Sequence, residues 1–314
     1  MPQEHIFRYI DEFADLSKKE GPFAISFTGG EPFLRYPDLL AATRYAKEKG
    51  ANQVSCVTNG FWGKDEATAR QWVTDLSESG LHHICFSIDD FHREYIPLDW
   101  VLTALEACRE AELHFGVKCA VTRHTRRLHQ VLGDLGNLLL DTDVTMQEIA
   151  CMPQGRAANR VPKDEWLVQE GIPQGPCPGI LMVSILPDGT TFPCCGGGWT
   201  QRLVVGNARS EHITELMTRA RDGALFAALR YKGPAFFVPY FSEAGCPLPQ
   251  EGYVNHCHLC KIILEHPESE RILQTALTDW KIEHVEQCLG GLWKPDDADY
   301  TRLRASAKME RGHG

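Results

Sequence analysis

The chain has 314 residues, of which 43% are hydrophobic and 24% charged, and its formal net charge at pH 7 is -10. This composition is globular and excludes a collagen-like, coiled-coil or intrinsically disordered chain. The negative charge disfavours sequence-independent nucleic-acid binding, because phosphates repel it. No apolar run reaches the roughly 20 residues of a membrane span. The first residues lack the basic start and apolar core of a secretory signal. We therefore expect a cytoplasmic protein without nucleic-acid or membrane partners.

Helical and strand-like patterns alternate through the first 150 residues. The predicted helices are 4–19, 38–49, 65–79, 100–112 and 127–140, and the predicted strands are 23–27, 53–58, 83–88, 116–122 and 145–151. Strands that are apolar on both faces and are joined by helices indicate a parallel sheet covered by helices. No Gly-x-Gly-x-x-Gly follows the first strand, which argues against a dinucleotide-binding fold. A full or partial (β/α) barrel fits this α/β pattern better.

Polar or glycine-containing segments follow every predicted strand. They lie at 28–32, 58–60, 87–92, 122–123 and 153–156. In a barrel of parallel strands these ends meet at one edge, where the chemistry of such folds takes place. The sequence therefore predicts a functional site built from these five segments.

The first of these segments lies in the stretch FTGGEPFL at 27–34, which resembles the signature after the second strand of radical S-adenosylmethionine (SAM) enzymes. Two glycines let a ligand approach the backbone closely, a glutamate can accept hydrogen bonds from a ligand ammonium group, and a proline fixes the turn. The resemblance covers about residues 4–157. It implies SAM binding by Gly29, Gly30, Glu31, Pro32, Asn59, Ser87, Asp89 and Arg123.

The sequence departs from that family at the catalytic [4Fe–4S] cluster. The family holds this cluster with a Cys-x3-Cys-x2-Cys loop after its first strand, and no such spacing occurs here. Strand 23–27 matches the family's second strand, so the resemblance implies a partial (β/α)6 barrel that lacks its first strand. Either the sequence is truncated or begins at an internal methionine, or the protein has lost the cluster. The presence of Glu31, Asn59, Ser87 and Asp89 favours truncation. Without the three thiolates we expect no SAM cleavage by the chain as given.

The sequence does not identify catalytic residues, and it offers only Asp90, His92 and Arg156 as candidates after strand ends. A metal site formed by Asp89, Asp90 and His92 is disfavoured, because adjacent strand residues point to opposite faces. Hydrogen bonding to a substrate, or polarising it, is one expected role for Asp90 and His92. An ordinary network of loop contacts is the alternative.

Seven of the twelve cysteines lie in the C-terminal half, whereas the other five are scattered through apolar or helical segments and are expected in the core. Cys177, a hairpin turn at Gly189 and Cys194 resemble the opening of the SPASM and twitch auxiliary-cluster domains of radical SAM enzymes. Cys257-x2-Cys260 adds two thiolates from what we expect to be a tight turn. No further cysteine follows closely, so one auxiliary cluster is expected.

The predicted ligands of that auxiliary [4Fe–4S] cluster are Cys177, Cys194, Cys257 and Cys260. Cys195 is an alternative to Cys194, and Cys246 or Cys288 is a candidate ligand of an additional site. Zinc also takes four thiolates, but zinc ribbons usually carry two Cys-x2-Cys pairs, and only one is present. Iron–sulfur is therefore the favoured interpretation, ahead of zinc and of unliganded cysteines.

The predicted organisation has four parts. These are a partial barrel at 1–157, a linker at 158–175, a small α+β cluster-binding domain at 176–265, and a C-terminal helix with a charged tail at 266–314. Within the third part, strands 180–185 and 190–192 and a helix at 211–231 capped by Ser210 are expected.

The resemblance implies an enzyme that generates a 5′-deoxyadenosyl radical for hydrogen abstraction, with a reductant such as flavodoxin or ferredoxin. A maturase of ribosomally made peptides is the favoured function, and a small-molecule dehydrogenase is the first alternative. A non-catalytic iron–sulfur or zinc protein is the second alternative, because the catalytic cysteine loop is missing.

Overall fold

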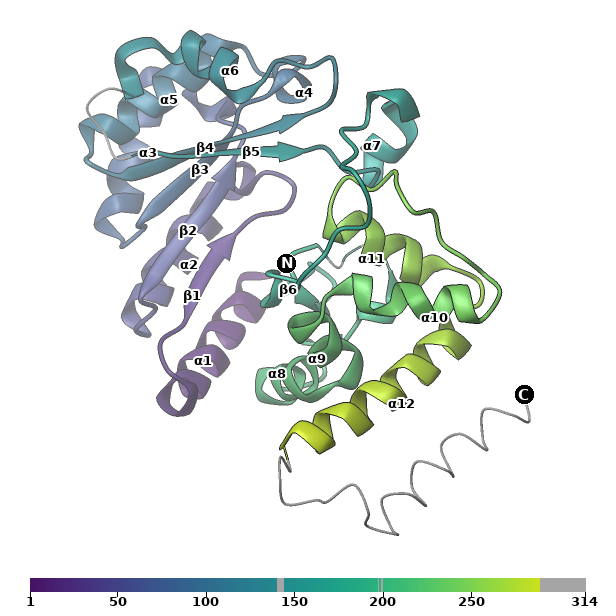
Figure 1. The fold of residues 1–314 in the computed structure, drawn as a ribbon. Helices are drawn as coiled ribbons and strands as arrows, with labels where there is room; N and C mark the ends of the chain where they lie inside the picture. The colour runs from purple at the N-terminus through teal and green to yellow at the C-terminus, as the bar shows by residue number, and fades with distance from the viewer. Residues whose placement is uncertain (140–143, 197, 199, 289–314) are drawn as a thin grey trace. The chain divides into compact units, whose positions relative to one another are not determined.

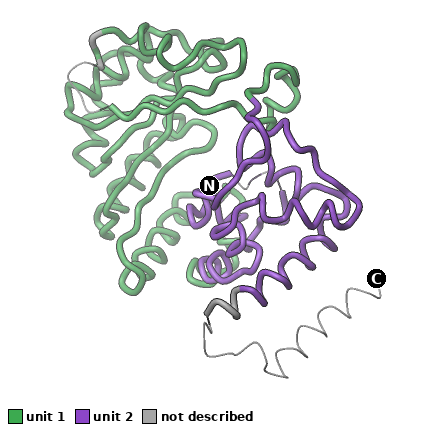
Figure 2. Tube along the Cα trace, in the orientation of Figure 1, with its two compact units in different colours: residues 1–167, 186–189, 207–215 green, residues 168–185, 190–206, 216–314 purple. Residues whose placement is uncertain are grey.

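The fold comes from a computed structural model that describes residues 1–139, 144–196, 198 and 200–288 (Figure 1). The chain forms two compact units (Figure 2). Unit 1 contains Met1–Leu167, Leu186–Gly189 and Asn207–Glu215, and unit 2 contains Val168–Ile185, Thr190–Gly206 and Leu216–Gly314. Each unit has its own hydrophobic core. Among the described helices, none is both long and apolar enough to cross a membrane.

Unit 1 is built on a parallel sheet whose described strands follow one another in chain order. The strands are β1 (Ala24–Phe27), β2 (Gln53–Thr58), β3 (His83–Ser87), β4 (His114–Val121) and β5 (Thr145–Ala150). The helices are α1 (Gln3–Glu20), α2 (Tyr36–Glu48), α3 (Glu66–Glu78), α4 (Asp90–Arg93), α5 (Leu98–Glu110), α6 (Leu128–Leu135) and α7 (Gly155–Arg160). The predicted α/β class with a parallel sheet is confirmed, and the arrangement is consistent with a partial (β/α) barrel.

The two faces of this sheet differ in character. Residues paired in register share a face, and one face carries buried apolar side chains such as Val54, Ile84 and Phe115. Helices α2, α3 and α5 lie over this face (Figure 1). The opposite face carries polar, partly exposed side chains, among them Ser55 and Lys118. The prediction that the strands are apolar on both faces is therefore wrong for this second face.

Unit 2 contains an antiparallel hairpin followed by helices. Strands β6 (Ile180–Ile185) and β7 (Thr190–Cys194) form the hairpin, and β8 (Gly206–Asn207) extends its sheet. The helices are α8 (Ile213–Asp222), which begins in unit 1, α9 (Ala224–Tyr231), α10 (Val238–Glu243), α11 (His256–Glu265) and α12 (Ser269–Cys288). The helix predicted at 211–231 is broken at Gly223, whose backbone is extended (φ -63°, ψ 126°). The prediction of one continuous helix is therefore wrong. Ser210 is not its cap either, because α8 begins only at Ile213.

Two further local predictions differ from the structure. Residues 158–160, the start of the segment interpreted as a linker at 158–175, end α7, and Trp166 farther along is buried with 6% exposure. Cys257-x2-Cys260 lies in the first turns of α11 instead of in a tight turn. The Asn255 side chain caps this helix by accepting a hydrogen bond from the backbone N–H of His258 at 3.0 Å. Because residues three apart share one side of a helix, both thiols can still face the same way.

Candidate functional site

The turn after β1 leaves its backbone open to an incoming molecule. Gly29 and Gly30 have φ values of 83° and 57°, a region that glycine adopts without strain. A Cβ atom built on either residue would meet no other atom within 4 Å, and both residues are exposed. This free space beside two glycines fits the predicted close approach of a cofactor such as SAM.

Glu31 ties the ends of β1 and β2 together. Its Oε1 accepts hydrogen bonds from the hydroxyl of Thr58 at 2.8 Å and from the N–H of Phe33 at 3.2 Å. Its Oε2 accepts a bond from the N–H of Asn59 at 2.8 Å. Burial raises the pKa of Glu31, although these three hydrogen bonds favour the charged form. The predicted role toward a ligand ammonium group therefore belongs to a carboxylate that already has three partners in the protein.

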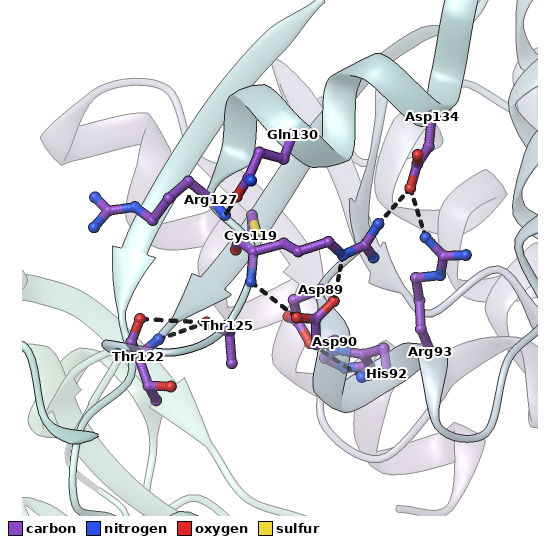
Figure 3. A network of polar contacts seen from close by, with 11 residues as sticks. Asp89, Asp90, His92, Arg93, Cys119, Thr122, Thr125, Arg127, Gln130 and Asp134 are labelled. Carbon is purple, nitrogen blue, oxygen red and sulfur yellow. Dashed lines mark hydrogen bonds and ion pairs between the residues drawn. The ribbon is translucent and has the colours of Figure 1, made fainter. Parts of the chain in front are cut away.

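Asp89 is a buried carboxylate at the end of β3, with 1% exposure. Its Oδ1 accepts a hydrogen bond from the backbone N–H of His92 at 3.0 Å and lies 2.8 Å from the His92 ring Nδ1. Its Oδ2 accepts a bond from the N–H of Ala120 at 3.2 Å. The side chain thus caps α4 and connects β3 to β4, so its predicted contact with a cofactor stays a prediction. Figure 3 shows Asp89 beside the His92 ring.

A second network holds α4 against the loop after β4. Asp90 accepts hydrogen bonds from the backbone N–H of Arg126 at 2.9 Å and from its Nε at 2.7 Å. Asp134 pairs with both Arg93 at 2.6 Å and Arg126 at 2.5 Å. Burial acts against ionisation of Asp90, but its bonds to Arg126 outweigh it and lower the pKa of Asp90. Asp90 and His92 therefore have different partners, Arg126 and Asp89 respectively.

The other predicted residues lie at the same edge with fewer contacts. Asn59 accepts a hydrogen bond at its side-chain oxygen from the N–H of Phe61 at 3.0 Å, which shapes the turn after β2. Ser87 ends β3 on the partly exposed polar face. Arg123 and Arg156 are exposed, and the described residues form no side-chain hydrogen bond or ion pair with either. The structure thus gathers the predicted residues at one edge. Among their described side chains, only those of Glu31 and Asp89 form hydrogen bonds to a neighbouring strand or its end.

Unit 2 brings the four predicted ligand cysteines near one another. Cys194 ends β7 and pairs with Ile180, and Ile180 follows Cys177 by three residues in the chain. Both Cys177 and Cys257 act electrostatically on Cys194, and all three act on Cys260. Cys195, the alternative ligand, is exposed and acts on both Cys194 and Cys257.

The other two C-terminal cysteines contribute less to this group. The Cys246 thiol lies 3.8 Å from the carbonyl oxygen of Ala244. Its role as a ligand of an additional site stays a prediction. The side chain of Cys288 lies outside the described residues.

Burial keeps these thiols protonated in the metal-free chain. It raises the pKa of Cys194 to about 12 and that of Cys257 to about 11, and it also raises the pKa of Cys260. A bound metal deprotonates a coordinating thiol even when burial raises its pKa. The positive end of α11 favours negative charge near Cys257. The donor set therefore fits a thiolate-ligated metal group.

The described residues contain no group of three or more His, Cys, Asp or Glu side chains arranged to hold a single metal ion. Around one zinc ion, four sulfurs at about 2.3 Å from the metal must nearly touch one another. In a four-iron cluster each thiolate binds a different iron, so the sulfurs stand farther apart. The choice between zinc and a cluster for these four cysteines stays a prediction. The catalytic cluster is different, because the printed sequence has no Cys-x3-Cys-x2-Cys spacing to hold it.

Sequence reasoning missed the pairing of Asp89 with His92 and the contacts of Asp90 with Arg126. The first had a usable signal, because an Asp at a helix start accepts the backbone N–H three residues later and so brings residue 92 next to Asp89. The second had none, since Asp90 and Arg126 are 36 residues apart.

Three similarities to known proteins accompany this geometry. Residues 1–123 match the family model described as the radical SAM superfamily. The chain is 24% identical over 248 residues to the "Putative peptide biosynthesis protein YydG" of Bacillus subtilis (strain 168), an alignment that covers 77% of this chain and 75% of that protein. It is 30% identical over 179 residues to the "GTP 3',8-cyclase" of Limosilactobacillus fermentum, covering 53% of this chain and about half (47%) of that protein. The match to the radical SAM superfamily thus lies within unit 1, the unit that carries Glu31 and Asp89 at the ends of its strands.

Proposed function

We propose that this protein is a radical SAM enzyme that modifies a peptide, with SAM at the C-terminal edge of the unit 1 sheet and an auxiliary iron–sulfur cluster in unit 2. Membership in the superfamily implies SAM and a [4Fe–4S] cluster, which together supply a hydrogen-abstracting radical when bound. A reductant such as flavodoxin or ferredoxin belongs to the proposal.

The observation that supports a peptide substrate is the extent of one similarity. The alignment with the Bacillus subtilis protein, whose name refers to peptide biosynthesis, covers 77% of the chain, which is more than unit 1 contains. It therefore reaches into unit 2, where the cysteines lie. Because the similarity covers both units, it supports a shared substrate class better than a match to the sheet alone would.

In this proposal each residue has a limited task. Gly29 and Gly30 leave room for the cofactor, and Glu31 holds the ends of β1 and β2 in place beside it. Cys177, Cys194, Cys257 and Cys260 hold the auxiliary cluster, which accepts an electron from the substrate or ligates it. Cys195 is exposed next to Cys194 and is available as the alternative ligand.

A small-molecule substrate is the second candidate, because the similarity to the GTP 3',8-cyclase has the higher identity, 30%. The first candidate is tested with a form of the protein that also carries a Cys-x3-Cys-x2-Cys loop. This form is reconstituted anaerobically with iron and sulfide and incubated with candidate peptides and a reductant, and each peptide is analysed by mass spectrometry. We expect one peptide to change in mass only when SAM is present. Unmodified peptides together with consumption of a nucleotide or another small molecule would favour the second candidate.

A further inference from the structure

We propose that His92 is a proton acceptor for the substrate, and that its Nε2 atom removes a proton from a hydroxyl or thiol of the peptide. The inference rests on the proposed function and adds a catalytic residue to it. It rests on the contacts and the exposure of the His92 ring.

The first step concerns the proton on the ring. The Asp89 carboxylate has 1% exposure and accepts hydrogen bonds from two backbone N–H groups, of His92 at 3.0 Å and of Ala120 at 3.2 Å. A carboxylate with these two donors can itself only accept hydrogen bonds. The ring Nδ1, at 2.8 Å from Oδ1, must therefore carry a hydrogen. In the neutral ring this leaves Nε2 with a free lone pair.

The second step concerns access to that lone pair. The His92 side chain is 41% exposed, whereas its partner Asp89 has a side-chain exposure of 2%. Among the described residues, none forms a hydrogen bond with Nε2. One nitrogen is thus fixed by a buried carboxylate and the other is open, which is how proteins orient a histidine toward a ligand or a proton.

The third step concerns location. Asp89 and His92 follow β3, whereas Gly29 and Gly30 follow β1, so these residues lie at the same edge of the parallel sheet, where the glycines leave open space. His92 therefore belongs to the same edge as the proposed cofactor position.

The proton transfer is balanced without any other reagent. The O–H or S–H bond of the substrate breaks, its electron pair stays on oxygen or sulfur, and the proton forms a bond to Nε2. The resulting imidazolium is held by the negative charge of Asp89 across the 2.8 Å contact. A base positioned in this way typically contributes a factor of about 100 to 10,000 to the rate.

Two measurements on the metal-free chain test the open lone pair without any activity. In the first, ¹⁵N-histidine spectra at pH 8 report the tautomer of His92, assigned by its absence in His92→Gln. In the second, diethyl pyrocarbonate labels accessible ring nitrogens, and the comparison is His83, whose Nε2 lies 3.2 Å from the hydroxyl of Thr145. We expect the Nδ1–H tautomer for His92 and labelling at least tenfold faster than for His83. The Nε2–H tautomer, or labelling no faster than His83, would overturn the proposal.

A third measurement tests the proton transfer in a holoenzyme that also carries the catalytic Cys-x3-Cys-x2-Cys loop. We expect His92→Gln to lower peptide product formation at least 100-fold, and His129→Gln, a change at an exposed histidine on α6, to leave it within twofold. Equal product from His92→Gln and the wild-type enzyme would overturn the proposal. If the wild-type holoenzyme modifies no peptide, the proposed function fails, and the tautomer and labelling results still decide whether His92 has an open acceptor.

Discussion

Replacing Glu31 by Gln should destabilise unit 1, because a side-chain amide cannot satisfy all three donors that the carboxylate satisfies. The one oxygen of Gln can face Thr58 and Phe33, whose distances to Oε1 are 2.8 and 3.2 Å. Its NH2 group then faces the N–H of Asn59, which lies 2.8 Å from Oε2 in the wild-type protein. Two donors would meet, and one would lose its partner.

The size of the effect follows from two opposing contributions. A partly buried N–H left without an acceptor costs about 1–3 kcal/mol, and hydrogen bonds to a charged group are worth about 1.5–3 kcal/mol. Against this, the variant no longer buries a charge, and burial is the main reason why the pKa of Glu31 is raised. We expect a net loss of about 1–2 kcal/mol in the free energy of unfolding. In a unit of this size that corresponds to a Tm lowered by roughly 2–8 °C.

Urea denaturation followed by circular dichroism measures this loss, and Asp65→Asn is the matched control. Asp65 also caps a helix, accepting a bond from the N–H of Thr68 at 2.8 Å. Asn caps helices about as well as Asp, so this variant should stay within about 0.5 kcal/mol of the wild-type protein. If Glu31→Gln is as stable as the wild-type protein or more stable, the burial of charge outweighs the hydrogen bonds. Our account of this turn would then be refuted.

Three further predictions concern other parts of the chain. Gly116→Ala should lower the stability of unit 1 by about 1–3 kcal/mol in urea denaturation, since the added Cβ would lie 2.1 Å from the Oγ1 of Thr145. Gly133→Ala in α6, where a Cβ meets nothing within 4 Å, should instead stabilise by up to about 1 kcal/mol, and the opposite order of the two would contradict the packing of the polar face. Metal-free unit 2 should lose stability as the pH rises from about 8.5 toward 11–12. Burial raises the pKa of Cys257 to about 11 and that of Cys194 to about 12, so these thiols ionise at a lower pH in the unfolded chain than in the folded one. Their contribution to stability is complete below the ordinary thiol pKa and is lost as the pH rises through the folded-state values. Thermal unfolding across that pH range should show a shallower decline for Cys194→Ser, and an identical decline would argue against burial of this thiol. Arg126→Ala should cost about 1–2 kcal/mol, since two partly exposed ion pairs are lost; no change in thermal unfolding would show that the network is not structural.

The general plan of unit 1 could be predicted because its signals are local. Apolar runs of strand length alternate with helical periodicity, and this alone indicates a parallel sheet whose strand ends share an edge. What these ends do there depends on distant partners. Glu31 could be located from a turn motif, but its bonds come from Thr58 and Asn59, which follow 27 and 28 residues later.

Errors arose where local chemistry was ambiguous. Gly223 interrupts a continuous helical pattern, because its backbone is extended and a Cβ there would lie 2.7 Å from the carbonyl oxygen of Arg219. A glycine inside such a pattern is often tolerated, so the sequence does not reveal the break. Conversely, Asn255 before Cys257 is a good helix cap, and this signal could have placed Cys257 and Cys260 on a helix. The polar face of the sheet was missed because the strands are short. In a strand such as β2, a few small polar residues such as Ser55 alternate with apolar ones, and the segment as a whole still looks apolar.

The most direct test of the account is the metal content of unit 2. Anaerobic reconstitution of the chain with iron and sulfide should give a brown protein with about four irons and four sulfides per chain, and reduction should produce an electron paramagnetic resonance signal of a [4Fe–4S] cluster. Cys257→Ser should lose most of this iron, whereas Cys246→Ser, a change outside the proposed ligand set, should keep it. A colourless protein that carries one zinc ion per chain and no sulfide would contradict the account, as would a Cys257→Ser variant with the full iron content.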